Sequence, residues 1–262
     1  MAANFPYRLF CSPRRGFFTI SFYFLTIYVN MVASNLAVVR WNLLSDELRV
    51  AAPDVLHDIF PVYTNHKLKE WPLVFLYIVF LAFTIRYDLM GIPHPDMPKS
   101  NRHRLTKGRM RGLWDYKRGE SFIRYFETRS VIELMRASTV ALTAFSDPLG
   151  QGCVDHEVSA VAPGEVWTTW TFARCGDNIF SGHASQLLSL VCVIQSYVMT
   201  QRHVGGVGSS RWAVLSAALW TATVMLSFYI VIARLHYTVD VVLAWIVVPT
   251  VWLAWGQVSG PS

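Results

Sequence analysis

The segment CGDNIFSGHASQLLS, residues 175–189, leads into an apolar stretch of membrane-spanning length and places His183 at its start. About fifty residues later, HYTVDVV at residues 236–242 places His236 at the start of another apolar stretch. Side chains four residues apart share one face of a helix, so Asp240 is placed to hold and orient the His236 imidazole. We interpret the two segments as the two halves of one active site.

The composition is that of an integral membrane protein. Of the 262 residues, 53% are hydrophobic and only 15% are charged. The net charge of +6 is unevenly spread, because eleven of the 23 Lys and Arg residues fall between Arg86 and Arg129. A basic loop between apolar segments is what the positive-inside rule predicts, so we expect a lipid bilayer and no nucleic acid among the partners.

The apolar segments predict an all-α, polytopic membrane protein with six transmembrane helices in a single membrane-embedded domain over residues 1–262. The helices are predicted at about residues 17–39, 72–90, 131–146, 178–200, 212–233 and 237–255, with a basic cytosolic loop at 86–130. The third predicted helix contains Glu133 and Arg136, which should face protein or a water-filled cavity instead of lipid.

The distribution of positive charge predicts the orientation of these helices. No small-residue cleavage site follows the first apolar run, so we expect a retained anchor, with both termini in the cytosol. The cytosolic segments then carry 3, 11 and 2 Lys and Arg residues, against 6 on the opposite side. This topology places His183, His236 and Asp240 at the same luminal or extracellular face.

Two further segments each allow two interpretations. APDVLHDIFP, residues 52–61, is either a short interfacial helix opened by Pro53 and Asp54 or an ordinary connecting loop. Cys153 and Cys175 flank one polar loop, so they either form a disulfide in an oxidising lumen or stay free thiols.

The residues at the two motifs suit transfer of a phosphoryl-type group. His236 would attack phosphorus while Asp240 orients it, and His183 would protonate the departing alcohol and deprotonate the incoming one. Backbone N–H groups at the helix start after Ser181 and Gly182 suit phosphate oxygens. Arg234 would supply further positive charge to the site, beside a bound substrate.

The same residues allow two other interpretations. Histidines at the start of a helix are often structural and hydrogen-bonded, and a metal site formed by His183, His236, Asp240 and Asp177 is chemically possible. The sequence has no tight cluster of several histidines, and we expect neither a metal nor another cofactor.

CGDNIFSGH and HYTVD resemble the two signature segments of the sphingomyelin synthase and inositol phosphorylceramide synthase family, within the lipid phosphate phosphatase-like group. APDVLHDIFP resembles the family's luminal Pro-Asp segment, and RASTVALTAFSDPLGQGC at residues 136–153 resembles its third-helix segment and following loop. The resemblance extends from Ala52 to Trp245.

The resemblance implies a helical bundle of the lipid phosphate phosphatase-like type and a defined reaction. A phospho-alcohol headgroup moves from a glycerophospholipid to ceramide through a phosphohistidine, without a metal, and diacylglycerol is released at the luminal leaflet of the Golgi or at the plasma membrane. The catalytic residues would be His183, His236 and Asp240, and Asp177 matches a further acid near the family's site.

The headgroup stays open, because choline, ethanolamine and inositol donors present the same phosphodiester to the same residues. Two alternatives to the synthase also stay open. One is a lipid phosphate phosphatase that uses the same residues with water as acceptor, and the other is a non-catalytic lipid-binding membrane protein of the same architecture.

Overall fold

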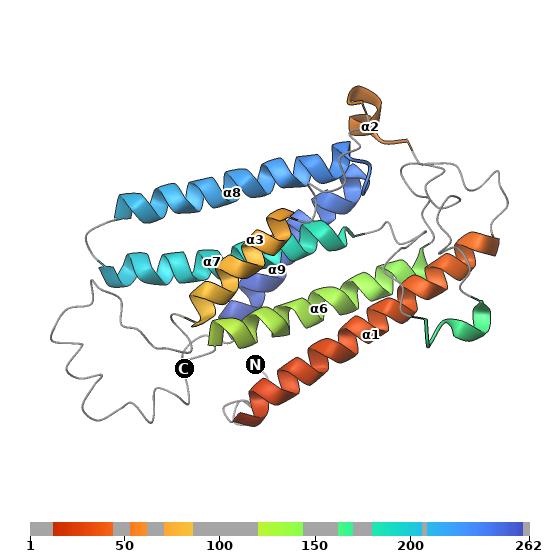
Figure 1. The fold of residues 1–262 in the computed structure, drawn as a ribbon, viewed down its shortest axis with the longest axis horizontal. Helices are drawn as coiled ribbons and strands as arrows, with labels where there is room; N and C mark the ends of the chain where they lie inside the picture. The colour runs from red at the N-terminus through yellow and green to blue at the C-terminus, as the bar shows by residue number, and fades with distance from the viewer. Residues whose placement is uncertain are drawn as a thin grey trace, which may run out of the picture.

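The computed structural model describes residues 13–43, 53–61, 71–85, 120–143, 162–169, 180–205 and 209–258, and the structural statements below concern these residues. Within them the regular structure is entirely helical, which confirms the predicted all-α class. Six longer helices lie side by side in a bundle (Figure 1), namely α1 (Pro13–Leu43), α3 (Trp71–Phe83), α6 (Glu120–Leu142), α7 (Gly182–Gly205), α8 (Ser209–Ile232) and α9 (Thr238–Val258). The short α2 (Val55–Ile59) and the 3₁₀ helix η6 (Pro163–Glu165) lie at one end of this bundle.

The bundle has the apolar exterior expected of a membrane protein. Within the described residues, the segments Arg15–Arg40 and Ala213–Ile232 are long and apolar enough to cross a membrane, and those at Trp71–Ala82 and Thr238–Ala254 are apolar but shorter. Large apolar side chains are exposed on the outer faces of α3 and α8, such as Phe75 and Met225. Helices α1, α6 and α8 run in one direction, and α3, α7 and α9 in the other (Figure 1). Six crossings stay a prediction with which this alternation agrees.

Helix α7 is the centre of the bundle and packs against α3, α6, α8 and α9. Its apolar residues lie in two buried clusters. The first contains Leu187, Leu190 and Val191 with Phe80 and Trp252. The second cluster joins the start of α7 to α6, α8 and α9, and its members include Ala184, Leu188, Ile132, Ile230 and Val241. The position of α7 therefore depends on four neighbours at once.

Helix α1 packs along α6 through small side chains. Ala33 and Ala37 of α1 meet Ala137 and Val140 of α6 in one buried cluster. Small residues at such a contact let two helix backbones approach closely, which is how transmembrane helices commonly associate. On α1, the amide of Asn35 also donates to two carbonyl groups of the segment around η6, those of Val166 and Thr169, both at 2.8 Å.

The structure corrects the predicted third helix and the loop before it. Helix α6 begins at Glu120, inside the segment predicted as a loop up to residue 130, and ends at Leu142. Charged residues made the first part of α6 look like a loop, but their side chains face neighbouring helices. Arg124 donates to the carbonyl oxygen of Trp252 at 2.7 Å, and Glu127 pairs with Arg15 at 3.0 Å. Hydropathy alone cannot anticipate such partners.

The other predicted helices differ from the structure mainly at their ends. Helix α7 begins at Gly182 instead of residue 178, and it continues to Gly205. The segment at residues 52–61 contains the short helix α2, capped by Asp54, so of the two interpretations the helix is correct. Residues 86–90 of the predicted second helix lie outside the described residues.

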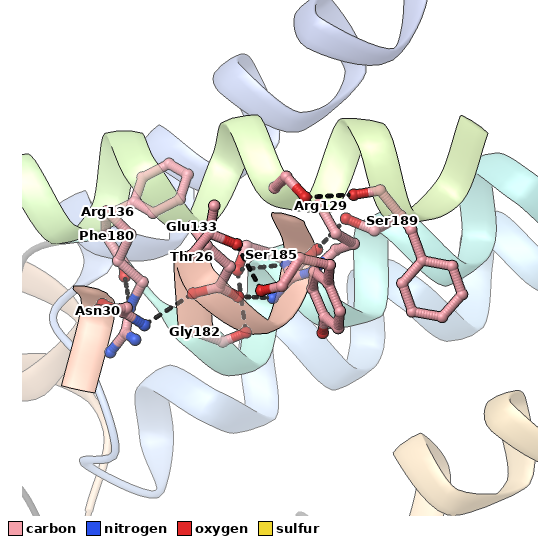
Figure 2. Close-up of polar contacts among 12 residues, drawn as sticks. Thr26, Asn30, Arg129, Glu133, Arg136, Phe180, Gly182, Ser185 and Ser189 are labelled. Atoms are coloured by element: carbon pink, nitrogen blue, oxygen red, sulfur yellow. Dashed lines mark hydrogen bonds and ion pairs between the residues drawn. The ribbon is translucent and has the colours of Figure 1, made fainter. Parts of the chain in front are cut away.

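A buried chain of polar contacts joins α1, α6 and α7, and we call it the α6 polar network (Asn30, Arg129, Glu133 and Ser185). The amide of Asn30 donates to one carboxylate oxygen of Glu133 at 2.7 Å, and Arg129 pairs with the other. Arg129 also donates to the hydroxyl of Ser185 at 3.2 Å, two residues beyond His183 (Figure 2). All four residues are buried, so each charge of the network has a partner inside the bundle.

Removal of one partner should cost more than removal of both. We expect Glu133→Leu to lower the free energy of unfolding by about 3–5 kcal/mol, because Arg129 is left as an unpaired buried charge. The double variant Arg129→Met with Glu133→Leu leaves neither charge and should lose much less. Chemical denaturation of the detergent-solubilised protein measures both values, and equal losses in the two variants would contradict the cost assigned to the unpaired Arg129 charge.

Candidate active site

The structure brings His183, His236 and Asp240 together at one end of the bundle. His183 lies in the first turn of α7, His236 in the connection between α8 and α9, and Asp240 in the first turn of α9. The two imidazole rings lie 5.7 Å apart between centroids, at an interplanar angle of 62°. His236 is buried and His183 is half-buried, so one ring is enclosed by protein and the other is accessible.

The Asp240 carboxylate faces the Nδ1 atom of His236. Nδ1 lies 3.7 Å from Oδ2 of Asp240, which is longer than a hydrogen bond. Oδ2 also accepts the backbone N–H of Tyr237 at 3.0 Å, which fixes the carboxylate. Nδ1 and the second carboxylate oxygen, Oδ1, have no hydrogen-bond partner within the described part of the chain. A ring movement of about half an ångström would close the hydrogen bond and leave Nε2 available for chemistry.

The start of α7 is held directly to α9. The hydroxyl of Ser181 accepts the N–H of Ala184 at 3.1 Å and so caps α7, while the N–H of Ser181 donates to the carbonyl oxygen of Asp240 at 3.3 Å. The preceding residue, Phe180, has a φ of 71°, a conformation that large side chains rarely adopt. This turn aims the N-terminal end of α7, with its partial positive charge, at the two histidines.

Arg136 lies against the Ser-Gly-His segment, which sequence reasoning did not anticipate. Its Nε atom donates to the carbonyl oxygen of Phe180 at 3.2 Å. A Cβ atom at Gly182 would lie 3.3 Å from the centre of the guanidinium group, so glycine permits this close approach. The prediction was only that Arg136 faces protein or a water-filled cavity instead of lipid. No local spacing relates it to a helix start more than forty residues away.

Arg234 faces α2 instead of the histidines. It ends α8 with a φ of 57°, in a turn closed by bonds from the Arg234 N–H to Val231 and from the Leu235 N–H to Ile230. Its guanidinium group donates to the carbonyl oxygens of His57 and Phe60. The expected role of Arg234 in substrate binding stays a prediction, and Asp177, Cys153 and Cys175 lie outside the described residues.

An apolar depression reaches the accessible histidine. It is shallow, with a cavity volume of only about 10 Å³. Apart from His183, its lining comes from α3, α7 and α8, namely Pro72, Leu73, Leu187, Leu226, Tyr229 and Ile230. Among the described residues no group of three or more His, Cys, Asp or Glu side chains is placed to hold a metal ion.

Residues 174–257 match the family model described as PAP2 superfamily C-terminal. This range contains His183, His236 and Asp240. Two curated relatives are similar as well. The chain is 27% identical over 157 residues to the phosphatidylinositol:ceramide inositolphosphotransferase of Trypanosoma cruzi, strain CL Brener, covering 54% of this chain and 44% of the relative. It is 38% identical over 71 residues to phosphatidylinositol:ceramide inositolphosphotransferase 3 of Arabidopsis thaliana, covering 27% and 20%.

These matches confirm the resemblance to the sphingolipid synthases of the PAP2 superfamily. The chain spans less than half the length of either curated relative. The segment that the family model matches begins before α7 and ends within α9. It therefore contains His183 at the start of α7, His236 just before α9, and the helix α8 between them.

His57 of α2 lies beside the site, outside the predicted transmembrane segments. Its ring packs against that of Tyr237, with 5.6 Å between centroids. Burial lowers the pKa of His57. The negative charge of Asp54 opposes this change and the positive charge of Arg234 adds to it, so the net direction is downward. The folded protein therefore favours neutral His57.

Acidification should weaken the fold through His57. The unfolded chain takes up a proton near the ordinary histidine pKa of about 6.5, before the folded protein does, so the free energy of unfolding falls as the pH drops below that value. The melting temperature of the wild type should fall more between about pH 7.5 and 5.5 than that of His57→Gln, which retains every other histidine. Parallel pH profiles for the two proteins would show that His57 does not contribute.

Proposed function

We propose that the chain is a sphingolipid synthase that transfers phosphoinositol from phosphatidylinositol to ceramide and releases diacylglycerol. The observation that carries the proposal is the pairing of the two imidazole rings at 5.7 Å, with Asp240 behind His236. Inositol is favoured over choline and ethanolamine because both curated relatives are named as phosphatidylinositol:ceramide inositolphosphotransferases.

The first half-reaction uses the atom of His236 that does not face Asp240. Nε2 attacks the phosphorus of the donor, and the bond from phosphorus to the diacylglycerol oxygen breaks. The oxygen takes the electron pair of that bond and a proton from His183, so neutral diacylglycerol leaves. Asp240 stabilises the positive charge that His236 gains, because its carboxylate faces Nδ1.

The second half-reaction reverses these roles. His183, now neutral, takes the proton of the ceramide hydroxyl, whose oxygen attacks the phosphorus. The phosphorus–nitrogen bond breaks and returns its electron pair to His236. One acceptor oxygen replaces one donor oxygen, so the transfer consumes neither water nor metal.

Positive charge and apolar surface are both present where this substrate requires them. The N-terminal end of α7 and the Arg136 guanidinium lie together at the Ser-Gly-His segment, where phosphate oxygens would bind. The apolar side chains of α3, α7 and α8 that line the shallow depression would contact an acyl chain next to His183. We place the site at the luminal or extracellular face of a single six-helix catalytic domain, in the Golgi or plasma membrane, with both termini in the cytosol.

The test is headgroup transfer by the purified protein in vesicles that contain fluorescent ceramide and one donor lipid. With phosphatidylinositol we expect a new phosphosphingolipid and an equal amount of diacylglycerol, resolved by chromatography. His236→Ala should abolish transfer because the nucleophile is gone, and His183→Ala should lower it by about 10²- to 10⁴-fold because the general acid is gone.

His203→Ala is the matched control, because residue 203 lies about 30 Å along α7 from His183. It should retain full transfer. Product from phosphatidylcholine or phosphatidylethanolamine alone would change the headgroup but keep the synthase. Release of inorganic phosphate from a lipid monophosphate, without dependence on ceramide, would replace the synthase with a lipid phosphatase. If neither assay gives product while lipid still binds, the chain is a non-catalytic binding protein.

A further inference from the structure

Helix α2 is hydrogen-bonded to the residues on both sides of His236, although α2 and His236 are about 180 residues apart in the sequence. On one side, Arg234 donates to the carbonyl oxygens of His57 and Phe60 at the end of α2. On the other side, Thr238 donates to the carboxylate of Asp54 at the start of α2. The connection between α8 and α9 that carries His236 is therefore held by the two ends of one short helix.

The Asp54 carboxylate caps two helices at once. Its Oδ1 accepts the N–H groups of Leu56 at 3.0 Å and His57 at 3.3 Å, which caps α2. The same atom accepts the hydroxyl of Thr238 at 2.7 Å, and Oδ2 accepts the Thr238 N–H at 2.6 Å. Since Thr238 is the first residue of α9, these bonds place a negative charge at the N-terminal end of that helix as well.

Of the four hydrogen bonds that the Asp54 carboxylate accepts, the two from Thr238 are the shortest. Burial of Asp54 alone would raise the pKa of its carboxyl group, but the hydrogen bonds from Thr238 outweigh it, so the pKa lies below its ordinary value. The carboxylate is ionised at neutral pH and keeps both acceptor oxygens.

Thr238 lies midway between the two residues that must stay aligned. His236 is two residues before it and Asp240 two residues after it, and their facing atoms are 3.7 Å apart without a hydrogen bond in this state. A rotation of the first turn of α9 would widen that gap. A displacement of about 1 Å at a reacting group lowers a rate by up to about 10²-fold, so even a small loosening of Thr238 matters.

We propose that Asp54 is a positioning residue that aligns His236 with Asp240 by holding the first turn of α9 through Thr238. The proposal rests on the proposed function, in which His236 is the nucleophile. Asp54 acts only on protein atoms, so its loss should slow the phosphohistidine step without weakening lipid binding.

The primary variant is Asp54→Ser, since serine caps a short helix about as well as aspartate, but its single oxygen lies one bond nearer the backbone and does not reach Thr238, so both bonds from Thr238 are lost. We expect kcat for headgroup transfer to fall by about 10- to 100-fold, with little change in KM or melting temperature. Asp58→Asn is the matched control, because Asp58 is an exposed carboxylate on the same helix. It should behave as the wild type does.

A double-mutant cycle tests whether the effect passes through Thr238. Thr238→Val removes the hydroxyl bond and keeps the N–H bond, so a smaller loss of kcat is expected. Adding it to Asp54→Ser should cost almost nothing further, because both changes break the same contact. Additive losses would show that Asp54 acts by another route and would overturn the proposal.

A measurement independent of turnover separates this proposal from the proposed function. Labelling of His236 by diethylpyrocarbonate, followed by peptide mass spectrometry, should be faster in Asp54→Ser than in the wild type or in Asp58→Asn. If the wild type transfers no headgroup but this difference is seen, the proposed function fails and the positioning role stands. Unchanged labelling, with a kcat that falls only as far as the melting temperature accounts for, would assign Asp54 to folding alone and overturn the role.

Discussion

The pairing of charges along α6 is the constraint on which the bundle depends. A charge inside an apolar helical bundle is costly unless another group of opposite charge, or a set of hydrogen bonds, meets it. Arg129 meets Glu133 on its own helix, and both reach outward to α1 and α7 through Asn30 and Ser185. Arg124 reaches α9 at Trp252. These partners lie on three different helices. The hydrogen bonds of the charged side chains on α6 therefore also fix how those helices pack.

The two histidines of the site are supported from opposite directions. His183 is tied to α6, because Ser185 bonds to Arg129 and Gly182 packs on Arg136. His236 is tied to α2, which lies outside the predicted transmembrane segments, through Thr238. A backbone hydrogen bond, from the N–H of Ser181 to the carbonyl oxygen of Asp240, joins the two halves directly. The distance between the rings therefore reflects both the interior of the bundle and the short helix at its end.

The sequence predicted the helices well wherever apolar residues alone define them. Helices α1, α8 and α9 lie close to the predicted ranges because their apolar runs are unbroken. The predicted beginning of α6 was wrong because a stretch that contains Arg124, Glu127 and Arg129 has the composition of a loop, although it is helical. Likewise, Pro53 and Asp54 allowed a short helix as one of two interpretations, but nothing nearby in the sequence indicated that the Asp54 carboxylate also caps α9.

By itself, the sequence determined the all-helical class, the residues proposed to carry the chemistry and the placement of Asp240 beside His236. The reason is that helical periodicity and the spacing of four residues act over one or two turns. Only the tertiary structure decided that Arg136 packs beneath Gly182 and that Asp54 reaches Thr238. These contacts join residues forty or more positions apart, and they form because buried polar groups must find partners among whichever helices pack beside them.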